Sequence, residues 1–325
     1  MKIIKAIRRI TAAVLSAAVL FSATACAANN SGGQSKEDGK LSIISTVFPP
    51  YDFAKQITGD KANLEILLPP GNETHTYEPS PSDIIAIQNC DIFLYIGGEN
   101  ELWADKILSS ADTSGIKIVK LIDTVTLLSE EDEHEEHEAD EHDGHEHEYD
   151  QHIWTSPANA KIMLNAICDA ICEVDGENAD YYKKNKDSYE SEITALQNDI
   201  KTAVDNAKNK TVIFGDRFPF RYFADEFGLD CYAAFPSCSD ESEPSAATVT
   251  MLIDKIKELD IPVVYYLEFS SRKVADTLCE QTGAQSLMLH SCHNVSKDDL
   301  DGGATYVSLM RQNLENLKIC LNGKE

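Results

Sequence analysis

The chain has 325 residues, of which 42% are hydrophobic, and its formal net charge is -27. This length and apolar content suit about two domains of ordinary size and exclude a wholly disordered protein. Asp and Glu outnumber Lys and Arg by 55 to 28, which argues against nucleic acid as a partner because phosphates attract basic patches. The acidic balance fits a protein that handles cations.

The N-terminus is typical of a secretion signal followed by a lipid anchor. Basic residues precede the apolar run 10–21, and small residues then lead to Cys26, in the order of a bacterial signal peptide. A cysteine directly after small residues resembles the bacterial lipobox, so we expect residues 1–25 to be removed and Cys26 to be acylated. The alternative is an ordinary signal peptide with a free cysteine nearby. Residues 26–40, rich in Ser, Gly and polar residues, are expected to form a flexible tether, which would hold the mature chain on the outer face of the cytoplasmic membrane.

Strands and helices are expected to alternate from residue 41 to residue 121, a rhythm that predicts βαβ units around a parallel sheet. The second expected strand ends abruptly at Pro69-Pro70-Gly71, because a chain with these residues cannot continue a ladder. The loop beyond it carries His75, at the edge where open α/β sheets bind ligands. The expected strands are 41–47, 64–68, 91–96 and 116–121, and the expected helices are 51–57, 84–88 and 103–108.

Residues 130–150 interrupt this rhythm with five histidines among thirteen acidic residues. Such a segment has almost nothing apolar to bury and is expected to be a solvated loop. If the segment held only acidic residues, it would be interpreted as a solubilising insertion. The interspersed imidazoles instead favour capture of metal ions. The expected affinity is modest, because binding must order a flexible chain. The histidines are His134, His137, His142, His145 and His147.

The second half begins with a helix that Ser156 caps and Pro157 opens. A long, highly charged helix at about 179–207 suits a spine between two lobes, and the βα rhythm then resumes. The expected strands are 211–214, 230–235, 262–267 and 286–289, and the expected helices are 221–227, 248–259, 271–282 and 305–321.

Eight cysteines remain after Cys26, and an even number outside the cytosol permits disulfides whose connectivity the sequence leaves open. Cys168 and Cys172 lie four residues apart on an expected helix and are equally consistent with buried small apolar side chains.

Four histidines lie outside the acidic block: His75, His152, His290 and His293. Each follows a strand or precedes a helix, away from the apolar stripes where core histidines would lie. Three imidazoles and one further group match the tetrahedral coordination of zinc, whereas manganese prefers oxygen ligands. Because these residues come from both halves of the chain, a bound cation would join the two lobes.

Several motifs resemble those of the zinc and manganese solute-binding lipoproteins that serve ABC importers. They are Pro-Pro-Gly before His75, Asp150-Gln151-His152, and the closing run 306–314, and the resemblance covers most of the mature chain. It implies an α/β fold of two Rossmann-like lobes with parallel sheets, joined by a long rigid helix, with a metal cleft between the lobes. The zinc-specific members of this family carry similar His-rich loops. The implied organisation is an N-terminal lobe at 41–155 that includes the loop 130–150, linking helices at 156–209, and a C-terminal lobe at 210–325.

The sequence departs from the family at its third ligand, a histidine whose place Arg217 takes. Arginine stays protonated and cannot ligate zinc, so we expect it to pair with a nearby carboxylate. The family's last carboxylate ligand falls close to His293, and we expect His75, His152 and His293 to form the site. His290 and Cys292 are less favoured ligands, and Cys292 could instead form a disulfide with Cys238. Asp216 and Glu243 are possible oxygen ligands.

The resemblance implies a non-catalytic, zinc-binding component of an ABC importer that passes Zn(II) to a membrane permease. A closed site of protein ligands holds metal, whereas catalysis needs an open position. The alternatives are a manganese- or iron-binding member of the same family, a metal-dependent adhesin, or a lobe adapted to an anion at Arg217. An extracellular zinc hydrolase, with Glu73 or Glu78 as base, is disfavoured because no His-Glu-xx-His motif or nucleophile elbow occurs. We expect a monomer.

Overall fold

The computed structural model describes residues 39–72, 77–129, 149–236 and 243–323, which belong to one compact unit. The signal segment, Cys26, His75, the five histidines of the acidic block and Cys238 lie outside the described residues. None of the helices described in these ranges is long and apolar enough to cross a membrane.

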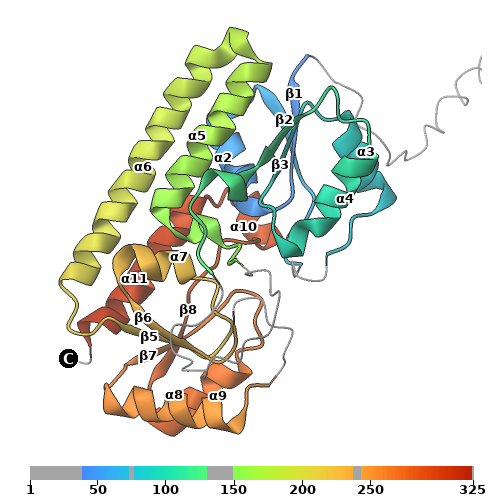
Figure 1. Cartoon of the computed structure of the whole chain (residues 1–325). Helices are drawn as coiled ribbons and strands as arrows, with labels where there is room; N and C mark the ends of the chain where they lie inside the picture. The colour runs from blue at the N-terminus through green and yellow to red at the C-terminus, as the bar shows by residue number, and fades with distance from the viewer. Residues whose placement is uncertain (1–38, 73–76, 130–148, 237–242, 324–325) are drawn as a thin grey trace, which may run out of the picture. The chain divides into compact units, whose positions relative to one another are not determined.

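Two parallel sheets of four strands each form the core of the fold, with strand orders β2-β1-β3-β4 and β6-β5-β7-β8 (Figure 1). The first sheet contains β1 (Leu41–Ser45), β2 (Ala62–Ile66), β3 (Ile92–Tyr95) and β4 (Lys117–Lys120). The second contains β5 (Thr211–Phe214), β6 (Asp230–Ala233), β7 (Val263–Tyr266) and β8 (Gln285–Met288). In each sheet the strand order reverses beside its first strand, and in open α/β sheets the carboxyl edge at such a point is the usual place for a ligand.

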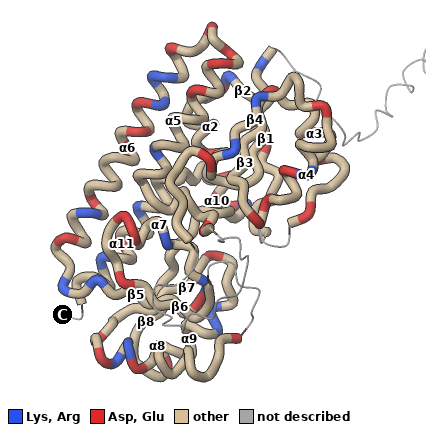
Figure 2. Tube along the Cα trace, in the orientation of Figure 1, with Lys and Arg blue, Asp and Glu red and all other residues tan. Residues whose placement is uncertain are grey.

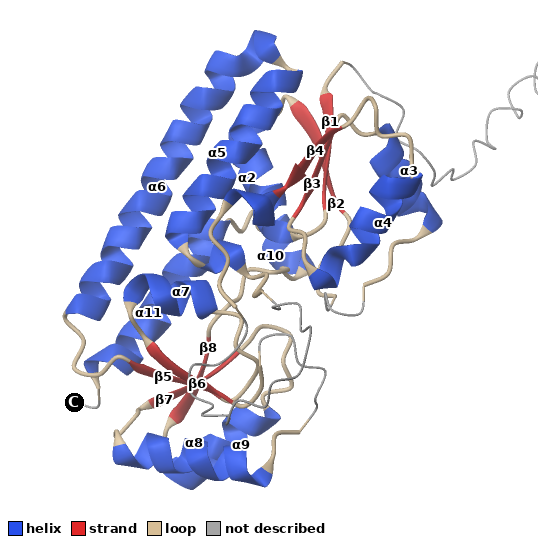
Figure 3. Cartoon of the chain, viewed as in Figure 1, coloured by secondary structure: helices blue, strands red, loops and turns tan. Residues whose placement is uncertain are grey.

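Helices cover both faces of each sheet, as parallel strands require (Figure 3). The helices are α2 (Phe48–Thr58), α3 (Pro81–Asn89), α4 (Leu102–Ser110), α5 (Pro157–Val174), α6 (Ala179–Asp205), α7 (Arg221–Phe227), α8 (Ala246–Glu258), α9 (Lys273–Thr282), α10 (Lys297–Asp301) and α11 (Tyr306–Asn322). Strand β3 is an example of a strand whose side chains are covered on both faces. Ile92 and Leu94 pack with α2 and α5 on one face. Phe93 and Tyr95 pack with α3 and α4 on the other. Successive side chains of a strand point to opposite faces, and all four are buried here.

Helix α6 has 27 residues and spans about 40 Å at the usual rise of an α-helix. Its buried side chains, which include Tyr189, Ile193, Leu196 and Ile200, recur every three or four residues and form one apolar stripe. Figure 2 shows acidic and basic residues along the rest of this helix. The stripe packs α6 against α2, α5 and α11. Helices α2 and α5 pack on the first sheet and α11 packs on the second, so α6 contacts helices that belong to both sheets.

These observations confirm the predicted fold class and correct several element boundaries. Helix α2 begins at Phe48, three residues before the expected helix 51–57. Proline lacks only an N–H that the first helical turn leaves unpaired, so Pro49 and Pro50 are compatible with a helix start. Helix α3 likewise begins at Pro81, capped by Ser80 in a capping box. The short helix α10 was not predicted.

Two carboxylates, the buried Asp52 and the half-buried Glu226, tie the long helices to the lobes. Asp52 of α2 accepts hydrogen bonds from the Tyr189 hydroxyl (2.6 Å) and from the Tyr306 backbone N–H (2.9 Å) at the start of α11. Glu226 of α7 accepts from the Ser156 hydroxyl and from the Ala158 N–H (3.1 Å), at the start of α5. Each carboxylate therefore satisfies unpaired N–H groups of a helix that lies far from it in the sequence.

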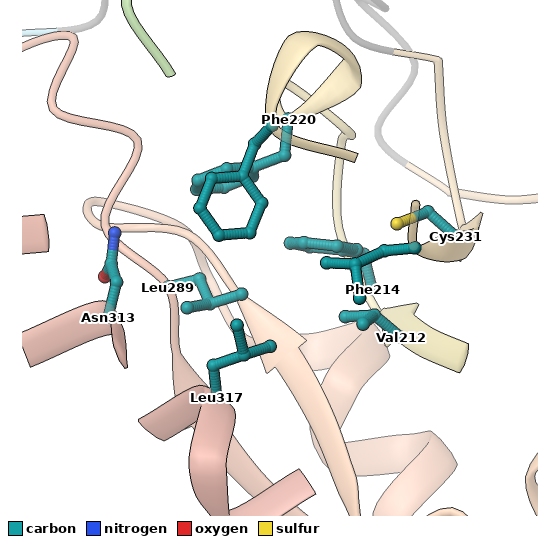
Figure 4. Close-up of a pocket in the computed structure, with 9 residues that line it drawn as sticks. Val212, Phe214, Phe220, Cys231, Leu289, Asn313 and Leu317 are labelled. Atoms are coloured by element: carbon teal, nitrogen blue, oxygen red, sulfur yellow. The ribbon is translucent and has the colours of Figure 1, made fainter. Parts of the chain in front are cut away.

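A small pocket lies between the second sheet and helices α7 and α11 (Figure 4). Phe214, Phe220 and Leu317 line it with apolar atoms. Asn313, the polar side chain at its rim, uses its amide to bind the backbone N–H (2.7 Å) and carbonyl (2.8 Å) of His290. The pocket is therefore part of the packing that fixes the chain where it leaves β8, and it offers no charged group to a ligand.

Candidate metal centre

His152 is held by a buried carboxylate. Asp150 is fully buried, and its Oδ1 atom accepts the backbone N–H of His152 at 2.8 Å and lies 3.1 Å from the Nδ1 atom of the ring. In the tautomer that this contact favours, Nδ1 carries the proton directed at the carboxylate and Nε2 carries the lone pair. Metal-binding histidines commonly have this carboxylate partner, which orients the ring and raises the basicity of the ligand nitrogen.

His293 approaches His152 from the second sheet. The two ring centroids are 5.4 Å apart and the ring planes are inclined by 86°. With zinc–nitrogen bonds of about 2.0–2.1 Å and a tetrahedral angle, two imidazoles on one ion have centroids about 5.2 Å apart. The separation of His152 and His293 therefore matches that of two ligands of a single zinc ion.

Trp154 connects the segments that carry these two histidines. Its indole Nε1–H donates to the Ser291 carbonyl at 2.8 Å, and its ring lies 4.8 Å from the His293 ring. The Tyr306 hydroxyl donates to the Trp154 carbonyl at 2.9 Å. The distance between the two imidazoles is thus set by buried hydrogen bonds rather than by two independent loops.

The start of the loop that carries His75 is fastened beside His293. The Asn294 side-chain amide donates to the carbonyls of Pro69 (2.8 Å) and Asn72 (2.9 Å), and the Gly71 N–H donates to the Val295 carbonyl (2.9 Å). His75 itself lies outside the described residues. Two residues separate it from Asn72 in the sequence, and Asn72 is the last described residue before it, held by Asn294 next to His293.

His290 is oriented away from a ligand role. Its Nδ1 atom accepts the backbone N–H of Cys292 at 2.9 Å, so in the neutral ring Nε2 must carry the proton and has no lone pair for a metal. Cys292 is fully buried with a free thiol directed at the His290 carbonyl. Burial raises the pKa of this thiol well above its ordinary value. These contacts favour His293 over both residues, and the predicted Cys238–Cys292 disulfide stays a prediction because Cys238 is outside the described ranges.

The other candidate oxygen ligands are engaged elsewhere. Both oxygens of Asp216 accept backbone N–H groups, from Arg217 (2.9 Å) and Leu267 (3.0 Å). Glu243 is exposed and pairs with Lys273 at 3.6 Å. Arg217 is half-buried where the chain leaves β5, and its predicted ion pair with a carboxylate stays a prediction. Within the described residues no group of three or more His, Cys, Asp or Glu side chains is placed to hold a metal ion.

The N-terminal sheet supports the His152 segment through a glycine turn. Gly97 and Gly98 have φ angles of 90° and 87°, which favour glycine, and a Cβ atom on Gly98 would lie 2.7 Å from the Gln151 side chain. The Gly97 N–H donates to the buried Glu101 carboxylate at 2.7 Å. Burial raises the pKa of Glu101 to about 7, although hydrogen bonds to the carboxylate oppose this rise.

This pKa predicts how stability depends on pH. Between the ordinary value of 4.5 and about 7, folded Glu101 keeps a proton that the unfolded chain has lost. Stability from this group is therefore present at low pH and is lost as pH rises through about 7. We expect the unfolding free energy of the metal-free protein to fall by about 2–3 kcal/mol more than that of Glu101→Gln between about pH 5 and 8. Denaturant titrations of both proteins test this, and parallel pH profiles would refute it.

Loss of the Asp150 carboxylate is expected to weaken zinc binding without removing a ligand. In Asp150→Asn the amide oxygen can still accept the His152 backbone N–H, but the charge that orients the imidazole is gone. We expect zinc affinity to fall by about 10–100-fold, measured by competition with a chromogenic chelator. Tyr222→Phe is the matched control, since the Tyr222 hydroxyl donates to the Asp150 carbonyl at 2.8 Å rather than to its carboxylate; an equal loss in both variants would contradict a specific role for the carboxylate.

The sequence predicts His152 and His293 as ligands but gives little sign of the residues that position them. The acid two residues before His152 was a signal for a carboxylate partner. Trp154 and Asn294 carried no such signal, because their partners Ser291 and Pro69 lie 137 and 225 residues away along the chain.

Two parallel α/β sheets linked by a long helix, with imidazoles that meet from separate segments, define a two-lobed binding protein of the metal-handling class. Residues 43–320 match the family described as zinc-uptake complex component A, periplasmic, and the chain belongs to this family.

Characterised relatives agree with this assignment. The chain is 35% identical over 303 residues to the high-affinity zinc uptake system protein ZnuA of Bacillus subtilis, covering 93% of this chain and 94% of the relative. It is 32% identical to the zinc-binding lipoprotein AdcA of Streptococcus pneumoniae over 88% of this chain, but spans only 56% of that relative's length. The crystal structure of the Zn(II)-bound ZnuA-like domain of S. pneumoniae AdcA superposes with a TM-score of 0.73 at 30% identity, covering 87% of this chain and 100% of that chain.

Proposed function

We propose that this chain captures Zn(II) outside the cytoplasmic membrane and presents it to the permease of an ABC importer. His75, His152 and His293 supply three nitrogen ligands, and Cys26 holds the protein to the membrane through its lipid. The observation that carries this proposal is the pair of imidazoles 5.4 Å apart, with Asp150 directing His152. Zinc-binding relatives of the same fold support it.

Zinc is the expected cargo for a chemical reason. Neutral imidazole nitrogens suit zinc, whereas manganese favours carboxylate and carbonyl oxygens. The family's last carboxylate ligand falls close to His293, and a histidine ligand there would move the donor set further toward nitrogen. The loop with His134, His137, His142, His145 and His147 would raise the local zinc concentration, and Arg217 would neutralise a carboxylate near the cleft instead of ligating metal.

The test is metal binding by the mature domain, residues 41–325, with and without residues 130–148. We expect one tightly bound zinc in both forms, additional weaker zinc only in the form with the loop, and much weaker binding of Mn(II). Loss of all tight zinc binding on removal of the loop, or a preference for Mn(II), would overturn the proposed site. Deletion of the partner permease separates import from adhesion. Cells without the permease should lose zinc-dependent growth if the protein serves import, whereas an adhesin would keep its attachment to surfaces in these cells.

A further inference from the structure

Two cysteines form a close pair on α5, away from the histidine site at the start of that helix. The Sγ atoms of Cys168 and Cys172 are 3.9 Å apart. Cys168 is 2% exposed, whereas Cys172 is half-buried and therefore reachable from solvent. Cys168 lies eleven positions after Pro157, a distance of about 16 Å along a helix.

The helix prevents this pair from closing into a disulfide. Residues at i and i+4 of an α-helix have Cβ atoms about 5–6 Å apart, whereas a disulfide needs about 3.5–4.5 Å. Both residues lie inside the 18 residues of α5, so bond formation would require the helix to unwind locally. The pair is thus expected to stay reduced even in an oxidising compartment.

The same spacing suits a shared metal ion. Two thiolates with bonds of about 2.3 Å to one tetrahedral ion have sulfur atoms about 3.8 Å apart, close to the observed separation. We propose that Cys168 and Cys172 form a second metal site, a two-thiolate site for soft, thiophilic cations. The Cys172 Sγ atom also lies 3.8 Å from the Ala179 carbonyl oxygen, and water would supply the remaining ligands at this half-buried residue.

Burial determines which ions such a site would take. It raises the pKa of Cys168 to about 12, and the neighbouring thiol and Asp169 add to the rise. Binding of a divalent ion must therefore release two protons as the two S–H bonds break and two metal–sulfur bonds form. Only ions with a strong preference for sulfur meet this requirement at neutral pH, which separates this site from the imidazole site for zinc.

The experiment uses Cd(II) as the probe on the mature protein already loaded with zinc. Thiolate–cadmium charge-transfer absorption reports sulfur ligation and is silent for cadmium held by imidazoles alone. We expect one equivalent of cadmium per chain to give this absorption in the parent, a loss of at least tenfold in affinity in Cys172→Ser, and no change in Cys279→Ser. Cys279 is a half-buried thiol on α9 and serves as the matched control.

A parent protein without the absorption, or a Cys172→Ser variant that keeps it, would overturn the second site and leave the two cysteines as packing residues. Circular dichroism of Cys172→Ser verifies that α5 is intact, and Cys168→Ala, which keeps an apolar side chain in the core, provides a second variant with the same expected loss. Zinc binding by the histidines is measured separately, so failure here does not bear on the proposed import function.

Discussion

Replacing His293 by alanine is expected to lower zinc affinity by more than about 100-fold. This loss exceeds that expected when only the hydrogen-bond partner of a ligand is removed, as in Asp150→Asn. The imidazole of His293 faces that of His152 across 5.4 Å, and its removal leaves too few nitrogen donors for a tight tetrahedral site. Competition titration of the mature domain without residues 130–148 measures the change without interference from the acidic loop. Binding as tight as in the parent would show that another group takes this position.

The matched control is His290→Asn. The Asn oxygen can occupy the place of Nδ1 and accept the Cys292 N–H, which His290 accepts at 2.9 Å, so the loop keeps its hydrogen bond while the imidazole is lost. We expect a change of less than about threefold in zinc affinity, because an imidazole whose Nδ1 accepts a backbone N–H carries its proton on Nε2. A loss as large as that of His293→Ala would instead assign His290 to the site.

Removal of the Asp52 carboxylate is expected to destabilise the fold by about 4 kcal/mol, since buried donors would lose a charged acceptor. Asp52 is 1% exposed and joins α2 to Tyr189 of α6 and to the Tyr306 N–H of α11. Its burial raises its pKa although these hydrogen bonds lower it, so the carboxylate is costly to bury and strongly dependent on its donors. Denaturant unfolding of Asp52→Ala measures the loss.

Gln56→Ala is the control for the Asp52 variant. The Gln56 amide also donates to Asp52, at 2.9 Å, but from the next turn of the same helix and at a partly exposed position. Its removal is expected to cost less than about 1 kcal/mol, the net worth of an ordinary hydrogen bond. Equal losses in Asp52→Ala and Gln56→Ala would show that the connection between α2, α6 and α11 contributes little to stability.

The link through Asp52 also bears on how metal is bound. Tyr306 is joined to Trp154 through its hydroxyl, and Trp154 is joined to Ser291 beside the candidate ligands. Long helices fastened at both sheets oppose hinge bending, so capture of an ion is expected to involve the loops more than a rotation of the lobes.

The sequence by itself determined the alternation of strands and helices, because parallel strands buried on both faces are short apolar runs and helices between them carry one apolar stripe. It also singled out His152 and His293, since few histidines lie outside the acidic block and each follows a strand or precedes a helix. It misjudged the start of α2, where Pro49 and Pro50 are as compatible with a first helical turn as with a loop.

The contacts that favour His293 over His290, three residues apart on one loop, appear only in the tertiary structure. The choice depends on which ring nitrogen meets a backbone N–H, and on Trp154 and Asn294, whose partners are more than 130 residues away in the chain. Local residue patterns encode secondary structure because its hydrogen bonds are local. The direction of a side chain where a strand ends depends on contacts with distant segments, and these exist only once the chain has folded.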